Sequence, residues 1–181
     1  MSFIKTVLNF TTNIRTTGAL YETSKRAGQE VSKYVTDSHP QIIVEYGAGH
    51  GNITMAILAK MHKSSKLYVF EVNKTFCAEL NRISDKRLVV VSGSAELIDQ
   101  YVGEPVDCII STIPFSLIPD QVLTAIVKKS RQQLKTTGVI SQILYSTYHL
   151  KIYKKYFKQV SYKMILSLPL EFVYHCQNNE A

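Results

Sequence analysis

Val44–Asn52 reads Val-Glu-Tyr-Gly-Ala-Gly-His-Gly-Asn, and this stretch decides the fold. The apolar run Ile42–Val44 leads into it and the amphipathic segment Ile53–Met61 follows it, which predicts a strand, a tight turn and a helix. Three glycines at alternate positions let the backbone bend sharply and let a ligand lie against bare main chain. Glu45 stands two residues before the first glycine. This combination favours a ligand with a nucleoside and a cationic amino-acid part over one with a pyrophosphate.

Apolar runs and helical patterns alternate along the rest of the chain. We expect strands at 41–46, 66–71, 87–92, 106–111 and 139–145, with helices near 51–62, 73–84, 95–101 and 119–135. A helix-like segment at 148–157 and two more strand patterns at about 158–167 and 170–176 follow. This alternation predicts an α/β fold with a seven-stranded, mostly parallel sheet, helices on both faces and a terminal β-hairpin. It is the Rossmann-like layout of class I S-adenosylmethionine-dependent methyltransferases.

Length, charge and cysteine content limit the class of protein. The 181 residues carry a net charge of +7 and suit one globular domain, which we place at 39–181 behind a helical segment at 1–38. The longest apolar runs are far below the roughly 20 residues of a membrane span. The N-terminus lacks a signal-peptide pattern, and the three cysteines have no metal-ligand spacing, so we expect a cytoplasmic protein with reduced thiols and no metal site. The basic excess falls on the flanks, 1–34 and 147–181, which indicates either a solvated surface or a site for an anionic membrane surface or nucleic acid.

The N-terminal segment has an amphipathic pattern. On a helical wheel six apolar side chains fall within an arc of roughly 160°. These are Phe3, Ile4, Val7, Leu8, Phe10 and Ile14. Lys5 and Arg15 flank the arc. Such a face packs on the domain or lies in a lipid headgroup layer at the inner membrane surface, and both alternatives stay open.

Glu71 is the main candidate for nucleoside binding. It ends the second expected strand, 20 residues after Gly51, where a carboxylate accepts both hydroxyls of a ribose. A nicotinamide enzyme would use the same acid. However, dinucleotide sites favour Gly-x-Gly-x-x-Gly, and here Asn52 holds the position of the last glycine. The turn therefore favours S-adenosylmethionine.

Two further strand ends carry polar or aromatic candidates. Ser94 follows the third strand, where a polar side chain can meet the adenine amino group or cap the next helix. The fourth strand leads into Ile113-Pro114-Phe115 at the ligand-binding edge. Phe115 would present a ring face to a cation or a base; the alternative is that it belongs to the core.

Together these motifs resemble the soluble bacterial phospholipid N-methyltransferases, which methylate phosphatidylethanolamine and are distant relatives of the rRNA adenine dimethyltransferases. The resemblance rests on six segments in order, at 18–24, 44–51, 70–73, 93–95, 110–119 and 166–174. The chain departs from the family pattern at Tyr21-Glu22, His50 and Pro169-Leu170-Glu171. Thr112 stands where the rRNA enzymes have the Asn that holds the target amine, and the chain is too short for their RNA-binding domain. Both points argue against an rRNA substrate.

The strand ends and the resemblance together assign the cofactor site. Its expected residues are Gly18, Glu45, Gly47, Ala48, Gly49, Gly51, Asn52, Glu71, Val72, Asn73, Ser94, Ala95, Ser111, Thr112 and Ile113. A phospholipid amine must lose a proton before it attacks the sulfonium methyl. Tyr21 and Tyr145 are the candidates for orienting the amine, and His149 for the base. Tyr148 and His175 are further polar groups expected near this edge. Two roles stay open for Lys151, Lys154, Lys155 and Lys158, which could hold lipid phosphates or keep a helix soluble.

Three functions follow from these observations. The leading hypothesis is an S-adenosylmethionine-dependent N-methyltransferase acting on phosphatidylethanolamine or a related phospholipid at the membrane surface. The second is a methyltransferase of the same fold acting on RNA or a soluble small molecule. The third is a module that binds S-adenosylmethionine without catalysis. The oligomeric state stays open.

Overall fold

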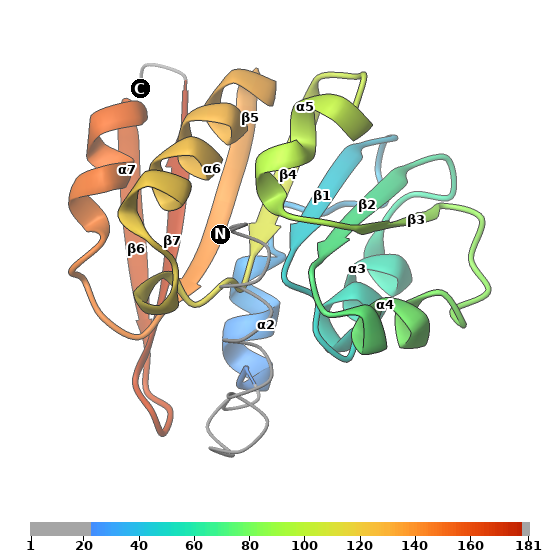
Figure 1. Ribbon diagram of the computed structural model, residues 1–181, viewed down its shortest axis with the longest axis horizontal. Helices are drawn as coiled ribbons and strands as arrows, with labels where there is room; N and C mark the ends of the chain where they lie inside the picture. Colours follow the sequence, from blue (N-terminus) through green and yellow to red (C-terminus); the bar gives the residue numbers. More distant parts are fainter. Residues whose placement is uncertain (1–22, 179–181) are drawn as a thin grey trace, which may run out of the picture.

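A single sheet forms the centre of the molecule (Figure 1). The computed structural model describes residues 23–178. The seven strands lie in the order β3-β2-β1-β4-β5-β7-β6. Their bounds are β1 Ile42–Tyr46, β2 Lys66–Glu71, β3 Leu88–Ser92, β4 Val106–Ser111, β5 Leu134–Leu144, β6 Gln159–Ile165 and β7 Glu171–Gln177. The first five strands are parallel, and β7 is antiparallel to both β5 and β6. The expected parallel sheet with a terminal hairpin is therefore confirmed.

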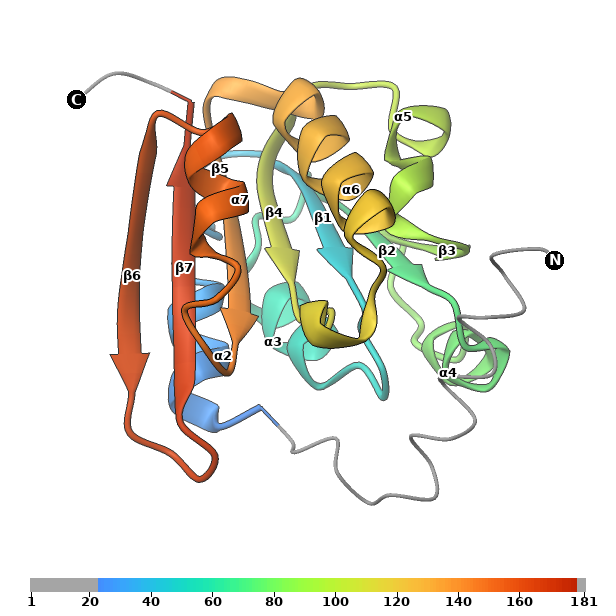
Figure 2. The ribbon, with the colours of Figure 1, turned by 60° about the vertical axis from the view of Figure 1, so that its left-hand side comes forward.

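Helices cover both faces of the sheet (Figure 2). One layer holds α2 (Lys25–Val31), α3 (Asn52–Lys60) and α4 (Lys74–Leu80), and the other holds α5 (Ile98–Tyr101), α6 (Asp120–Gln133) and α7 (Leu150–Tyr156). Short 3-10 turns, η1 (Ala95–Leu97) and η2 (Phe115–Leu117), precede α5 and α6. Each face has its own apolar cluster: Val44 and Tyr46 point toward α6, whereas Ile43 points toward α3. This alternation explains why the strands are apolar along their whole length.

Several element ends differ from the expectation, among them that of the helix expected at 73–84, which ends at Leu80. The helix expected to reach residue 135 ends at Gln133, and β5 begins at Leu134 rather than at 139. Leu134 is buried and pairs with Val106, and the register then shifts before Cys108 pairs with Val139. The residues between Leu134 and Val139 are mostly polar, because this part of the strand lies at the rim of the sheet. A search for apolar runs therefore misses the start of β5.

The carboxyl ends of the parallel strands meet at one edge. Tyr46 pairs with both Phe70 and Ser111, and Glu71 pairs with Ser92. In Figures 1 and 2 the tip of the β6–β7 hairpin and the first turn of α2 lie at this same end of the molecule. Ligands bind at this edge in open α/β sheets, so the fold places the glycine turn, α2 and the hairpin around the candidate site.

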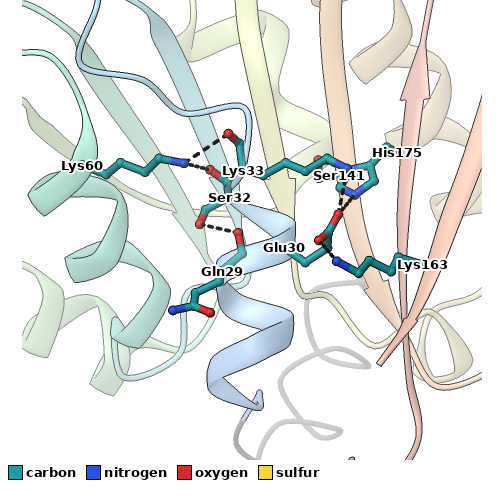
Figure 3. A network of polar contacts seen from close by, with 8 residues as sticks. All are labelled: Gln29, Glu30, Ser32, Lys33, Lys60, Ser141, Lys163 and His175. Atoms are coloured by element: carbon teal, nitrogen blue, oxygen red, sulfur yellow. Dashed lines mark hydrogen bonds and ion pairs between the residues drawn. The ribbon is translucent and has the colours of Figure 1, made fainter. Parts of the chain in front are cut away.

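Helix α2 is fastened to the sheet by a polar network (Figure 3). The Glu30 carboxylate contacts Lys33 Nζ at 2.7 Å, Lys163 Nζ at 2.7 Å and His175 Nε2 at 3.1 Å. The other ring nitrogen of His175 lies 2.8 Å from Ser141 Oγ on β5. His175 is therefore buried in the middle of β7 under α2, and the expectation that it lies near the carboxyl edge is wrong. It fills a packing role that joins residues 145 positions apart.

This network predicts acid destabilisation. Burial lowers the pKa of His175 from 6.5 to about 4, so the unfolded chain takes up a proton before the folded one does. Stability is complete above pH 6.5 and falls as the pH drops toward 4, by up to about 3 kcal/mol for this one group. Melting temperatures across this interval should fall less steeply in H175Q. H39Q, which changes an exposed histidine, should keep the wild-type slope; an unchanged slope in H175Q would contradict the assignment.

Some expectations fall on residues that the structure does not describe. The amphipathic pattern in 1–15, Gly18 and Tyr21 all lie outside 23–178. The domain boundary after residue 38 stays a prediction.

Candidate functional site

The turn between β1 and α3 has the backbone that its glycines predict. Gly47, Gly49 and Gly51 have φ of +74°, +54° and +84°, in the left-handed region that other residues avoid. A Cβ on Gly47 would lie 3.2 Å from Ile113 Cγ1, and one on Gly51 would lie 3.0 Å from Leu80 Cδ2. A Cβ on Gly49 would meet no atom within 4 Å. The turn is thus packed at its two ends and open in its middle, where main chain faces free space beside α3.

Glu71 holds this turn from the end of β2. Its Oε2 accepts a hydrogen bond from the Gly49 N–H at 3.0 Å, and its Oε1 accepts one from the Asn73 N–H at 2.8 Å. The carboxylate is 6% exposed. Each carboxylate oxygen can accept a second hydrogen bond, so Glu71 keeps acceptor capacity at the open part of the turn. This is the position expected for the group that binds ribose hydroxyls.

Glu45 lies on the same side of the sheet as Glu71 and is completely buried. Thr54 Oγ1 of α3 donates a hydrogen bond to Glu45 Oε2 at 2.6 Å, while Glu45 Oε1 has no partner among the described residues. Burial, reinforced by the negative charge of Glu71, raises the pKa of Glu45 from 4.5 to about 7. Because a buried carboxylate without a partner is costly, an incoming cation would stabilise it. The sequence reasoning chose Glu45 but missed Thr54, which a polar residue in the first turn of α3 could have indicated.

The segment after β4 lies against the glycine turn. Thr112 Oγ1 donates a hydrogen bond to the Gly47 carbonyl at 2.7 Å, and the Thr112 N–H donates one to the Tyr46 carbonyl at 3.1 Å. Gln142 Nε2 on β5 donates to the Ile113 carbonyl at 3.1 Å. Ser111 Oγ is buried without a partner among residues 23–178. Thr112 and Ile113 therefore lie against the glycine turn, and Gln142, which the sequence did not single out, holds the Ile113 carbonyl.

The other expected cofactor residues also lie at the carboxyl edge. Asn73 caps α4, because its side chain accepts a hydrogen bond from the Thr75 N–H. Ser94 caps η1 through the Glu96 N–H, which is the capping alternative raised from the sequence. Ala95 is buried. Ala48 lies within the glycine turn, Asn52 begins α3 and Val72 directly follows β2.

Phe115 does not present its ring to a ligand. It is 2% exposed and stacks on Tyr153 of α7 with the ring centroids 5.8 Å apart. The interpretation of Phe115 as a ligand-facing ring is wrong, because the η2 turn directs it into the apolar cluster under α6 and α7. Phe115 belongs to the hydrophobic core, which is the alternative that the sequence left open.

Two of the three expected catalytic residues lie on the connection between β5 and α7. The His149 ring packs edge-on against Phe115 at 5.6 Å, and burial lowers its pKa. Tyr145 follows the last residue of β5 and is 44% exposed; burial and the nearby Glu171 raise its pKa. His149 is therefore neutral and able to accept a proton at neutral pH, and Tyr145 offers a protonated hydroxyl at the same edge.

His50, the unusual residue inside the glycine turn, has a structural explanation. Its Nδ1 lies 2.7 Å from Glu79 Oε2, and its ring packs on Phe76 with the centroids 4.5 Å apart. His50 thus joins the turn to α4. Neither partner could be chosen from the sequence, since they lie on the next helix.

Comparison with known proteins supports the fold assignment. No protein-family model matches the chain. An ornithine lipid N-methyltransferase from Singulisphaera acidiphila is 25% identical over 145 residues, 76% of each protein. An rRNA methylase from Streptococcus thermophilus superposes with a TM-score of 0.63 at 17% identity, over 88% of this chain and 99% of that one. A candidate methyltransferase from Streptococcus mutans, solved with SAH, gives 0.65 at 16% identity, over 87% and 99%. The chain has the Rossmann-like fold of class I S-adenosylmethionine-dependent methyltransferases, as expected from its sequence.

Proposed function

We propose that this protein binds S-adenosylmethionine and transfers its methyl group to the amine of phosphatidylethanolamine or a related lipid. The observation that carries the cofactor part is the pairing of two carboxylates beside an open glycine turn. Glu71 reaches the Gly49 N–H, and Glu45 is buried with one oxygen unpartnered among the described residues. A ribose diol and an ammonium group are the ligands that this pair suits.

The residues fit the cofactor on two observations. The open space at the Gly49 Cβ position leaves room for a ligand against the main chain. The unpartnered Glu45 oxygen matches a cationic amino-acid group, and the spare acceptor capacity of Glu71 matches ribose hydroxyls. Ser94 and Ala95 border the edge where an adenine would lie. When bound, the cofactor supplies a methyl group already activated by a positively charged sulfur.

A lipid amine is the acceptor that the rest of the chain favours. The lipid N-methyltransferase relative covers 76% of the chain, and the charge of +7 suits an anionic surface. None of the helices in 23–178 has the length and hydropathy to cross a bilayer. The lipid-modifying relative and the positive charge favour a protein that works at the membrane surface, in contact with headgroups.

The catalytic work of this chain is to orient the amine and accept its proton. A phospholipid amine is mostly protonated at neutral pH, so a base must remove a proton before the nitrogen attacks. His149 is suited to this role because its lowered pKa keeps the imidazole neutral, the form that can accept a proton. The Tyr145 hydroxyl, on the same connection, is suited to orient the nitrogen by a hydrogen bond or a cation–π contact. Tyr21, outside the described residues, remains a second candidate for orienting the amine.

The base assignment predicts a selective loss of rate. H149Q should lower kcat for lipid methylation by about a hundredfold, as expected for loss of a general base, and leave cofactor affinity unchanged. Initial rates with labelled S-adenosylmethionine, together with calorimetric affinity, test this. Y148F changes the exposed neighbour and keeps its ring, so it should retain wild-type kcat. Equal rates in H149Q and wild type would exclude His149 as the base.

Transfer assays decide between the acceptors. Labelled S-adenosylmethionine is incubated with the protein and either phosphatidylethanolamine vesicles, ribosomal RNA or a pool of soluble amines. Label in the lipid fraction supports the proposal. Label in RNA or a soluble amine supports the second function, whose fold neighbours include an rRNA methylase. Cofactor binding without transfer to any acceptor would favour the non-catalytic module.

A further inference from the structure

The tip of the β6–β7 hairpin carries an unusual set of exposed apolar side chains. Leu166 is 77% exposed, Leu168 is 96% exposed and Leu170 is 37% exposed. Single exposed leucines are ordinary, but three in five residues at a protruding turn are not. Among the described residues, seven of the ten large exposed hydrophobic side chains lie between Tyr145 and Leu170. Apolar exposure is therefore concentrated on the hairpin and the connection beside it.

The tip is held in place by internal polar contacts. Ser167 Oγ lies 2.8 Å from the Pro169 carbonyl and 2.8 Å from Glu171 Oε2. The Ser24 hydroxyl and its N–H also donate hydrogen bonds to the Glu171 carboxylate, which is 2% exposed. These contacts join the base of the tip to the first turn of α2. They satisfy the Ser167 hydroxyl and the Pro169 carbonyl inside the protein and so fix the shape of the turn.

Basic residues are frequent on the elements that form and flank the hairpin. Lys25 and Arg26 occupy the first turn of α2, next to the Ser24 contact, and both are exposed. Counted over α2 and the segment from α7 to β7, there are seven Lys or Arg and two Glu. Both acids are engaged within the protein, Glu30 with Lys33 and Lys163, and Glu171 with Ser24. The hairpin and its neighbouring helices thus carry an excess of positive charge behind the apolar tip.

We propose that the tip of the β6–β7 hairpin, residues 166–170, inserts into the interfacial layer of an anionic lipid bilayer. Leucines at the point, exposed tyrosines at Tyr145, Tyr148 and Tyr162, and lysines farther back match the layered polarity of a membrane interface. The tip lies at the carboxyl edge of the sheet (Figure 2). Insertion would therefore turn this edge, with the glycine turn and the connection between β5 and α7, toward the headgroups. The inference rests on the proposed function and names the element that meets the lipid. An apolar point with basic residues behind it is the arrangement that suits a lipid layer with anionic headgroups.

Sedimentation with vesicles of phosphatidylethanolamine and phosphatidylglycerol tests the tip without using catalysis. The double variant L166S/L168S should lower the partition coefficient by roughly tenfold or more, because two apolar side chains no longer enter the bilayer. Its control, M55S/Y101S, removes two exposed apolar side chains from α3 and α5 and should bind as wild type does. Equal binding of L166S/L168S and wild type would overturn the inference.

Fluorescence gives a second readout that does not depend on a loss of binding. The chain has no tryptophan, so L168W introduces a single reporter at a side chain that is 96% exposed. Its emission should shift to the blue on adding these vesicles and be quenched by brominated acyl chains, whereas Y101W should show neither effect. Emission that is already blue without vesicles would mean that another part of this chain or a second copy covers the tip, and it would overturn the inference.

The lipid acceptor and the inserted hairpin can be rejected independently of each other. Insertion of the tip with methyl transfer only to RNA or a soluble amine would reject the lipid acceptor and keep the inserted hairpin. Methylation of lipid by L166S/L168S, with wild-type vesicle binding, would reject the hairpin and keep the acceptor.

Discussion

Replacing Glu71 with Ala is expected to weaken S-adenosylmethionine binding by about a hundredfold, because two charge-assisted hydrogen bonds to ribose are lost. The same change removes the acceptor of the Gly49 and Asn73 N–H groups, so the glycine turn loses its support as well. Both effects act in the same direction. Calorimetric titration of the purified protein measures the change, and methyl transfer at low cofactor concentration should fall with it.

Two further variants separate charge from shape. E71Q keeps the acceptor oxygen and the size of the side chain but loses the charge, so its affinity should lie between those of wild type and E71A. E79A removes an exposed carboxylate next to the same turn, where it pairs with His50, and should change affinity by no more than about twofold. Melting curves check that E71A is folded. Wild-type affinity in a folded E71A would remove Glu71 from the cofactor site.

The sheet could be predicted from the sequence because its strands are apolar along their length. β2 and β4 begin and end where their apolar runs do, and their carboxyl ends carry the expected candidates Glu71 and Ser111. β5 begins earlier than expected, since its first residues pair at the rim of the sheet and include polar side chains. A search for apolar runs finds the buried middle of each strand and misses strand ends at the rim of the sheet.

The cofactor side of the site was more predictable than the acceptor side for a physical reason. Parallel topology brings successive strand ends to one edge, so Glu45 and Glu71 could be placed together from the sequence. The role of His175 depends on Glu30, 145 positions away, and that of His50 depends on Glu79 on the next helix. Pairings of this kind are set by helix packing, which local patterns do not encode. For the same reason the ring of Phe115 was misassigned.

Glu45→Gln is expected to move stability and cofactor affinity in opposite directions. The pKa of Glu45 is 4.5 in the unfolded chain and about 7 in the folded protein, so folding favours the protonated acid. Its contribution is complete below pH 4.5 and is lost as the pH rises through about 7. A neutral amide avoids this loss, so E45Q should be more stable than wild type above pH 7 by about 1–3 kcal/mol. Melting temperatures of both proteins on either side of this interval test the sign.

The affinity for the cofactor should change in the opposite direction to the stability when Glu45 is replaced with Gln. An ammonium group beside Glu45 favours the ionised carboxylate, so binding near pH 7 should release a proton, and the apparent binding enthalpy should depend on the ionisation enthalpy of the buffer. In E45Q this buffer dependence should vanish and affinity should fall by roughly tenfold, the loss of one close charge pair. A stabilised E45Q that keeps full affinity and the same proton release would show that the buried carboxylate does not face the cofactor. Opposite shifts in the two measurements would instead mean that the fold tolerates a buried acid in order to hold a cationic ligand.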